Sequence, residues 1–298
     1  MIRNWIRPTN EPQPFWTAVV AAPRIWSSVF VIGLFITACT AASGEDAALE
    51  ASQVNTDTQT TQLQPGEARS EEVWDLLYFQ DSLGFGVADR YAEQIRVAVG
   101  AEVTVHDKAI GSLQAVNVLN GLRSDDTSDW SDLVREAEVI VFFGNPDGSG
   151  TTSDIATCIS GSPAERLPPV HNTEEDWMPY ETVLDDVFRE IWRIRDGEPV
   201  VLRAVEFINP AISAWREAGI EAECTEALEA MNRAIGNSAA RGGATLVSTY
   251  DLFNGTNHDE DPRTKGWIGP DGIHLSDEGE QAVADALAAS GLVTNQAP

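Results

Sequence analysis

Residues 78–86 read Tyr-Phe-Gln-Asp-Ser-Leu-Gly-Phe-Gly, an apolar run that stops at a serine followed by two glycines. The residues from Val73 to Phe79 are mostly apolar and β-prone, so they predict a buried strand. The change in character after Phe79 places Ser82 on a tight turn at the carboxyl end of that strand, where open α/β sheets hold their catalytic groups. Ser82 is therefore a candidate nucleophile, although Asp-Ser followed by Gly also forms ordinary structural turns.

A candidate base lies near the other end of the chain, where residues 269–276 read Gly-Pro-Asp-Gly-Ile-His-Leu-Ser. A serine hydroxyl is a poor nucleophile near neutral pH, and the imidazole of His274 has the right proton affinity to activate it. Asp271, three residues earlier, can reach the other ring nitrogen and fix the tautomer. The alternative interpretation is that Asp271 forms a structural turn and that His274 merely precedes a helix.

Two further segments carry hydrogen-bond donors at the ends of expected strands. The apolar stretch Val139–Phe143 is followed by Gly144 and Asn145, whose side-chain amide can donate to the oxyanion of an acyl-transfer intermediate. Gly111 follows a strand-like segment and offers a backbone N–H. The N–H of Ser82 is a third donor of the same kind.

In chain order, the segments around Ser82, Gly111, Asn145 and His274 form four blocks. Together these blocks resemble the SGNH hydrolases, also called the GDSL esterase/lipase family, over about residues 71–292. The resemblance implies a triad and an oxyanion hole. The triad is Ser82, Asp271 and His274. The oxyanion hole is formed by Ser82, Gly111 and Asn145.

Two blocks depart from the family pattern. The family's Gly-Asp-Ser-Leu is Gln-Asp-Ser-Leu here, with Gln80 in the place of the glycine. Its Gly-x-Asn-Asp is Phe-Gly-Asn-Pro here, so that the first glycine is replaced by Phe143 and the trailing aspartate by Pro146. The second change alters the loop that aims the Asn145 amide.

The amino terminus predicts export. Arginines precede an apolar run over residues 25–36, which is shorter than a membrane-spanning helix requires and suits the core of a signal peptide. The run ends at Ala38 and Cys39, and this pattern resembles a bacterial lipobox, in which the cysteine is lipidated and becomes the new amino terminus. A plain secretory signal and an uncleaved anchor are the alternatives. We therefore expect an exported protein of the bacterial cell envelope, lipid-anchored outside the cytoplasmic membrane or secreted.

After residue 39 the chain falls into segments of different amino-acid composition. Residues 40–70 are rich in Ala, Ser, Thr, Gln, Asp and Glu and lack aromatic residues. They cannot bury enough apolar surface to offset the entropy of ordering, so a disordered acidic tether is expected. Residues 71–293 predict one hydrolase-like domain, followed by a tail at 294–298.

The excess of negative charge limits the kinds of molecule that this protein can bind. The 298 residues include 19 basic and 47 acidic side chains, a formal charge of -28. Residues 1–39 hold three arginines and one glutamate, so 16 basic and 46 acidic side chains follow, a formal charge of -30. Such a chain is repelled by nucleic acid and by anionic lipid surfaces. Membrane contact is therefore expected through the lipid anchor alone.

Three cysteines are present. If Cys39 is lipidated, Cys158 and Cys224 form an even pair in an exported domain, which predicts a disulfide. The alternative is two free buried cysteines.

Alternating strand and helix patterns predict a three-layer α/β/α sandwich with a central, mostly parallel sheet of about five strands, the flavodoxin-like arrangement that the resemblance implies. The expected strands are 73–79, 102–106, 139–143, 199–205 and 245–248. The expected helices are 87–99, 113–119, 129–137, 181–195, 221–241 and 277–287. Residues 145–180 are expected to be an irregular wall of the substrate site, with His171 and Trp177 as candidate contacts.

The resemblance implies a serine hydrolase that cleaves carboxylic esters through an acyl-enzyme, with no metal or organic cofactor. Its substrate would be a small-molecule, lipid or glycan ester. One alternative is an O-acyltransferase acting on glycans. Another is a catalytically silent binding lipoprotein, which the altered third block and Gln80 motivate. No acyl chain, alcohol or oligomeric state follows from the sequence.

Overall fold

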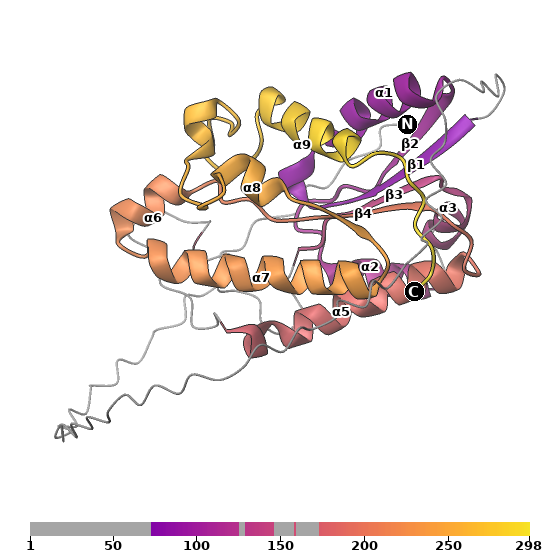
Figure 1. Ribbon diagram of the computed structural model, residues 1–298, viewed down its shortest axis with the longest axis horizontal. Coiled ribbons are helices and arrows are strands. Elements are labelled where there is room, and N and C mark those ends of the chain that lie inside the picture. The colour runs from indigo at the N-terminus through magenta and orange to yellow at the C-terminus, as the bar shows by residue number, and fades with distance from the viewer. Residues whose placement is uncertain (1–72, 125–128, 146–157, 159–172) are drawn as a thin grey trace, which may run out of the picture. The chain divides into compact units, whose positions relative to one another are not determined.

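A five-stranded parallel sheet lies at the centre of the computed structural model, which describes residues 73–124, 129–145, 158 and 173–298 (Figure 1). The strand order is β2-β1-β3-β4-β5, and every pair of neighbours is parallel. The expected fold class is confirmed. The strands are β1 (Val73–Phe79), β2 (Glu102–Asp107), β3 (Val139–Phe142), β4 (Val201–Val205) and β5 (Thr245–Val247).

The hydrophobic pattern of the strands explains the layering. All residues of β3 and β4 are buried, as are Leu76–Phe79 of β1, because helices cover both faces of the sheet. From β1 the chain passes to β2 on one side and later to β3 on the other, so the topological switch point lies between β1 and β3. Ligands of open α/β sheets bind beyond the carboxyl ends of the strands at such a point. Ser82 follows β1 and Asn145 follows β3, and both therefore lie at this edge.

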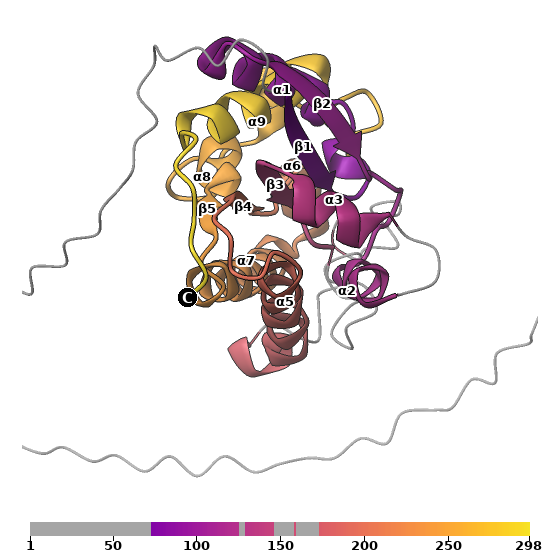
Figure 2. The same ribbon diagram turned by 90° about the vertical axis from the view of Figure 1, so that its right-hand side faces the viewer.

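The helices form the two outer layers (Figures 1 and 2). α1 packs against α9 on one face, and α5 packs against α7 and α2 on the other. The helices are α1 (Val87–Val99), α2 (Ala115–Arg123), α3 (Trp130–Glu136), α5 (Glu174–Ile194), α6 (Ile212–Ala218), α7 (Glu221–Arg241), α8 (Thr249–Asn254) and α9 (Asp277–Ala289), with 3-10 turns η1 (Ser82–Gly84) and η2 (Pro262–Lys265).

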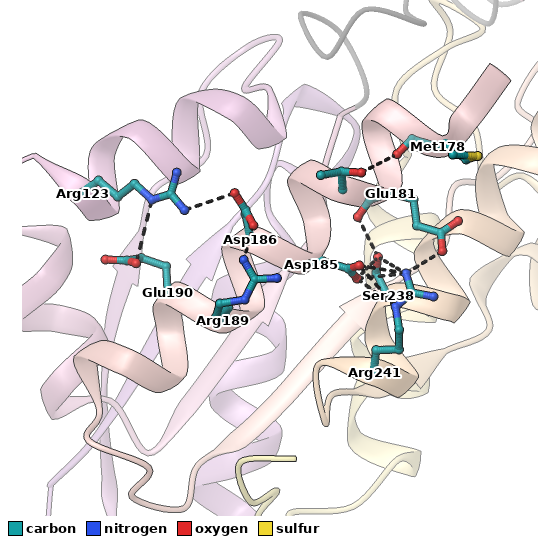
Figure 3. A network of polar contacts seen from close by, with 10 residues as sticks. Arg123, Met178, Glu181, Asp185, Asp186, Arg189, Glu190, Ser238 and Arg241 are labelled. Carbon is teal, nitrogen blue, oxygen red and sulfur yellow. Dashed lines mark hydrogen bonds and ion pairs between the residues drawn. The ribbon is translucent and has the colours of Figure 1, made fainter. Parts of the chain in front are cut away.

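Ion pairs connect α5 to its two neighbours (Figure 3). Arg123 of α2 lies 3.1 Å from Asp186, and Arg241 of α7 lies 3.0 Å from Asp185. Such half-exposed pairs stabilise by at most about 1 kcal/mol each. Burial of the apolar stripe of α5 therefore contributes most to holding this helix in place.

Four expected helices differ from the observed bounds; the differences at α3 and α9 are only one or two residues at an end, and those at α2 and α5 are larger. We expected Asn120 and Gly121 to end the helix that begins at Leu113, but α2 continues to Arg123. Gly121 sits inside the helix because the Trp130 ring packs where a side chain at this position would lie. We expected an irregular segment up to Tyr180, but α5 begins at Glu174, where a capping box joins Thr173 and Asp176.

The shorter elements α6, α8 and η2 were not predicted. They have only 7, 6 and 4 residues, two helical turns or fewer, so hydrophobic periodicity is a weak signal for each of them. Near the carboxyl terminus, Asn295 bridges to Val200 beside β4. Its side-chain oxygen accepts from Arg203, a fully buried residue of β4, at 3.0 Å. The end of the chain is thus tied to the sheet.

The predicted disulfide is present: Cys158 is bonded to Cys224 of α7, and both side chains are fully buried. The expected signal peptide 1–39 with Cys39, the tether 40–70 and His171 lie outside the described residues. Within the described part of the chain, no helix is long and apolar enough to cross a membrane.

Candidate active site

The nucleophile candidate lies on the short turn that follows β1. Asp81 precedes η1, and its Oδ1 accepts the N–H of Leu83 at 2.9 Å. This bond tightens the turn, since the carboxylate binds the backbone two residues further on. Ser82 is left half-buried at the carboxyl end of β1, as the sequence predicted.

The structure brings Ser82 and His274 together although they are 192 residues apart. Ser82 Oγ lies 3.0 Å from His274 Nε2, and His274 Nδ1 lies 2.6 Å from Asp271 Oδ2. An ionised carboxylate can only accept, so Nδ1 carries the proton in this arrangement. Nε2 of the neutral ring is then free to accept the proton of the Ser82 hydroxyl.

Asp271 is held by its own loop. Its Oδ1 accepts the backbone N–H groups of Ile273 and His274, each at 3.0 Å. The bond from Ile273 and then the bond to the His274 ring hold the pKa of Asp271 below its ordinary value. The carboxylate therefore remains ionised under mildly acidic conditions, where it continues to orient His274.

The two predicted donor loops are tied to the residues just before Ser82. The N–H of Ile110, next to Gly111, donates to the carbonyl of Gln80 at 3.2 Å. The Asn145 amide donates to Asp81 Oδ2 at 2.8 Å. These bonds place Gly111 and Asn145 at the same edge of the sheet as Ser82.

Two backbone N–H groups at this edge have no hydrogen-bond partner in the described part of the chain. The N–H groups of Ser82 and Gly111 donate to no acceptor within the described residues. The four predicted blocks therefore meet at one place, where the backbone N–H groups of Ser82 and Gly111 can donate to a bound ligand.

The structure shows a packing role for the Gln80 side chain that the sequence did not predict. Its side chain is fully buried, and its Nε2 donates to the carbonyl of Gly84 at the end of the Ser82 turn. A methyl group added at Gly84 would overlap the Gln80 carboxamide. The glutamine that replaces the family's glycine thus fits because residue 84 has no side chain.

The catalytic segments also pack on one another beneath the surface. A cavity of about 20 Å³ lies between Leu83, Leu275, Gln80 and Glu206. It has room for about one water molecule, so an ester does not fit there. The side chains of His274 and Asp271 are 43% and 50% exposed, so both face solvent.

One expected contact is corrected. Trp177 is fully buried in α5 and packs edge-to-face on Tyr180, with ring centroids 5.9 Å apart, so it belongs to the core and not to a substrate wall. Among the described residues, no group of three or more His, Cys, Asp or Glu side chains is placed to hold a metal ion.

A family model described as GDSL-like Lipase/Acylhydrolase matches residues 67–287. The chain belongs to this family. It is accordingly a carboxylic ester hydrolase. In this GDSL hydrolase, Ser82 and His274 are hydrogen-bonded, and the Asn145 amide binds the residue just before Ser82.

Solved structures share the fold of this GDSL hydrolase. The lipase Lip_vut3 from a goat rumen metagenome is 18% identical, with a TM-score of 0.54 over 74% of this chain and 98% of that lipase. A protein assigned as a GDSL-like lipase, from Parabacteroides merdae, is 13% identical, with a TM-score of 0.50 over 75% of this chain and 98% of its own. At these identities the likeness establishes the fold alone. No curated protein matches the sequence.

The packing of Gln80 over Gly84 generates a prediction about stability. Gly84→Ala should lower the free energy of unfolding by about 1–3 kcal/mol, because the new methyl group overlaps the buried carboxamide. Gln80→Gly removes that carboxamide, so Gly84→Ala should cost less in the Gln80→Gly background. Urea unfolding of the two single variants and the double variant measures the coupling.

Gly111→Ala is the matched control, since no heavy atom lies within 4 Å of its added methyl group. It should leave the urea midpoint nearly unchanged. Equal losses from Gly84→Ala in both backgrounds would contradict the proposed packing.

Proposed function

We propose that this GDSL hydrolase is a serine esterase that works through an acyl-enzyme, with Ser82 as the nucleophile. The hydrogen-bonded series from Ser82 Oγ through His274 to Asp271, at 3.0 Å and 2.6 Å, carries the proposal. Membership of the family gives the reaction class, ester hydrolysis. The substrate is an ester of a small molecule, a lipid or a glycan.

Acylation begins with attack of Ser82 Oγ on the ester carbonyl carbon while His274 Nε2 takes the hydroxyl proton. Asp271 stabilises the imidazolium through its bond to Nδ1. The carbonyl oxygen, now negative, accepts from the N–H groups of Ser82 and Gly111 and from the Asn145 amide. His274 then returns its proton to the leaving alcohol as the C–O bond breaks, which leaves an acyl-serine.

Deacylation repeats the same steps with water. His274 Nε2 takes a proton from water, whose oxygen attacks the acyl carbonyl carbon, and the same donors hold the oxyanion. Collapse releases the carboxylic acid, and His274 returns the proton to Ser82 Oγ. The enzyme is restored, and one ester and one water have become one acid and one alcohol.

Loss of the hydroxyl should abolish turnover. Ser82→Ala should lower kcat for p-nitrophenyl acetate by at least about 10³-fold, because the remaining oxyanion donors cannot supply a nucleophile. The circular dichroism spectrum should not change, since Ser82 is only half-buried. Release of p-nitrophenolate measures the rate.

Ser213→Ala, at an exposed position of α6, is the control and should retain full activity. Turnover by Ser82→Ala at the wild-type rate would remove Ser82 from the mechanism. Wild-type protein without any esterase activity would favour a silent binding protein. Consumption of the ester that requires an added sugar acceptor would indicate an acyltransferase.

We also propose that the domain is exported and anchored through lipid on Cys39, with residues 40–70 as its tether. The apolar core at 25–36 followed by Ala38 and Cys39 supports this assignment. The formal charge of -30 after residue 39 is consistent with a domain held near a membrane by its anchor and not by its surface.

Metabolic labelling tests the anchor. Wild-type protein made in a bacterium should incorporate radioactive palmitate and partition with membranes, and Cys39→Ser should do neither. Ser43→Ala, four residues further on, should label normally. Equal labelling of the Cys39→Ser variant, or a wild-type chain that carries no label, would reject lipidation at Cys39.

A further inference from the structure

A second pocket lies beyond the carboxyl ends of β4 and β5. It has a volume of about 450 Å³, within the range of pockets that hold small molecules. Its walls come from α7, β5 and α8, from the residue after β4 and from the loop after α8, and Ser82, Asp271 and His274 do not line it. This pocket is therefore a candidate binding site separate from the triad.

The walls of this pocket carry more negative than positive charge. Its three carboxylates are Glu206 after β4, Glu229 of α7 and Asp251 of α8. Arg233 lies 3.9 Å from Glu229, and the two ring nitrogens of His258 lie 3.2 Å from Glu229 and 2.8 Å from Asp251. Even with a charged imidazole, two cations face three carboxylates. The pocket therefore attracts a positively charged ligand.

Glu206 is the carboxylate without a cation beside it. Arg233 and His258 pair with the other two carboxylates and not with this one. Burial raises the pKa of Glu206; a hydrogen bond from the Tyr250 backbone opposes the rise, and the charge of Asp251 adds to it. A cation bound in the pocket would stabilise the ionised form of Glu206.

The hydroxyl of Tyr250 also lacks a partner in this pocket. Tyr250 is 2% exposed, and its ring stacks on His258 with the ring centroids 3.8 Å apart. Its hydroxyl oxygen is buried and has no hydrogen-bond partner among the described residues. Burial first, and then the charges of the three carboxylates, raise the pKa of Tyr250, so the hydroxyl lies close to those charges. Burying a hydroxyl without a partner is unfavourable, and a ligand can supply the missing hydrogen bond.

The chemistry of the walls selects the ligand. Carboxylates only accept hydrogen bonds, and a phenol oxygen can accept as well, so the ligand must donate. The described residues include no group of three His, Cys, Asp or Glu side chains placed around a metal ion. The three carboxylates instead come from three different elements, which an extended chain with several ammonium groups can reach. Leu246 of β5 adds an apolar wall for the methylene groups of such a chain.

We propose that this pocket binds a linear polyamine, with its ammonium groups on the three carboxylates and one of them donating to the Tyr250 hydroxyl. The site is independent of the acyl-enzyme mechanism, because the pocket contains no residue of the triad.

Isothermal titration calorimetry of the full-length protein with spermidine tests the proposal. The buffer holds about 0.15 M salt, so that long-range attraction to the acidic surface is screened. We expect saturable binding of one spermidine per chain. Ser82→Ala should bind equally well, because Ser82 does not line the pocket. Triacetylated spermidine, which carries no charge, should not bind.

Two variants locate the site. Glu229→Gln and Tyr250→Phe should each weaken spermidine binding about tenfold, because each removes an acceptor for a charged donor. Glu223→Gln is the matched control, since Glu223 is an exposed residue of α7 outside the pocket and the variant loses the same charge. Its affinity should equal that of the wild type. Unchanged circular dichroism spectra show that the variants are folded.

Binding that does not saturate, or that falls equally in Glu223→Gln and Glu229→Gln, would show general attraction to an acidic surface and would overturn the proposal. Wild-type affinity in Tyr250→Phe, or equal binding of triacetylated spermidine, would also overturn it. Failure of the proposed function has a different signature, which is full ester turnover by Ser82→Ala. The two conclusions can therefore be rejected independently.

Discussion

The site depends on one hydrogen bond, from Ser82 Oγ to His274 Nε2, which joins segments 192 residues apart. The partners are placed by a pair of helices. α1 begins five residues after Ser82, α9 begins three residues after His274, and the two helices pack together. Arg90 of α1 donates to Glu280 of α9 at 3.0 Å. The loop with His274 is thus fixed to the helix that follows Ser82.

The parallel sheet brings the expected hydrogen-bond donors close to Ser82 in a similar way. Strands β1 and β3 are neighbours and end at the same edge, so the residues that follow them meet without long loops. Asp81 then joins the two ends, since one carboxylate oxygen binds the Leu83 N–H and the other binds the Asn145 amide. A single buried carboxylate therefore connects the turn that holds Ser82 to the loop that holds Asn145. The Tyr180 hydroxyl donates to the carbonyl of Gly144 in that same loop.

Much of this could be predicted from the sequence because strong local signals coincide with the site. The apolar run 73–79 and its sudden end located β1 and the Ser82 turn, and the helices 87–99 and 221–241 were found with their observed bounds. The pairing of Cys158 with Cys224 was also correct. An apolar run or a helical period extends along each of these elements, so a short-range pattern is sufficient to locate them, whereas the disulfide followed from the even pair of cysteines.

The rest depends on contacts that a linear pattern does not show. In the sequence Gly121 indicates a helix end, but in the structure the Trp130 ring packs against this glycine inside α2. Pro179 interrupts the helical pattern of α5, so the sequence around Trp177 indicates a surface loop. The side chains of Gln80 and Tyr180 donate to the backbone carbonyls of Gly84 and Gly144, and no local pattern in the sequence indicates either contact. The Thr173-x-x-Asp176 capping box was the one local signal that could have extended α5.

Mapping the adduct of an alkyl fluorophosphonate by mass spectrometry tests whether Ser82 is the nucleophile that His274 activates. We expect one phosphonyl group per chain, on Ser82 Oγ, formed at least about 10³-fold more slowly in His274→Gln, because that variant lacks the base. An adduct on another serine, or equal rates in the wild-type and His274→Gln proteins, would contradict it.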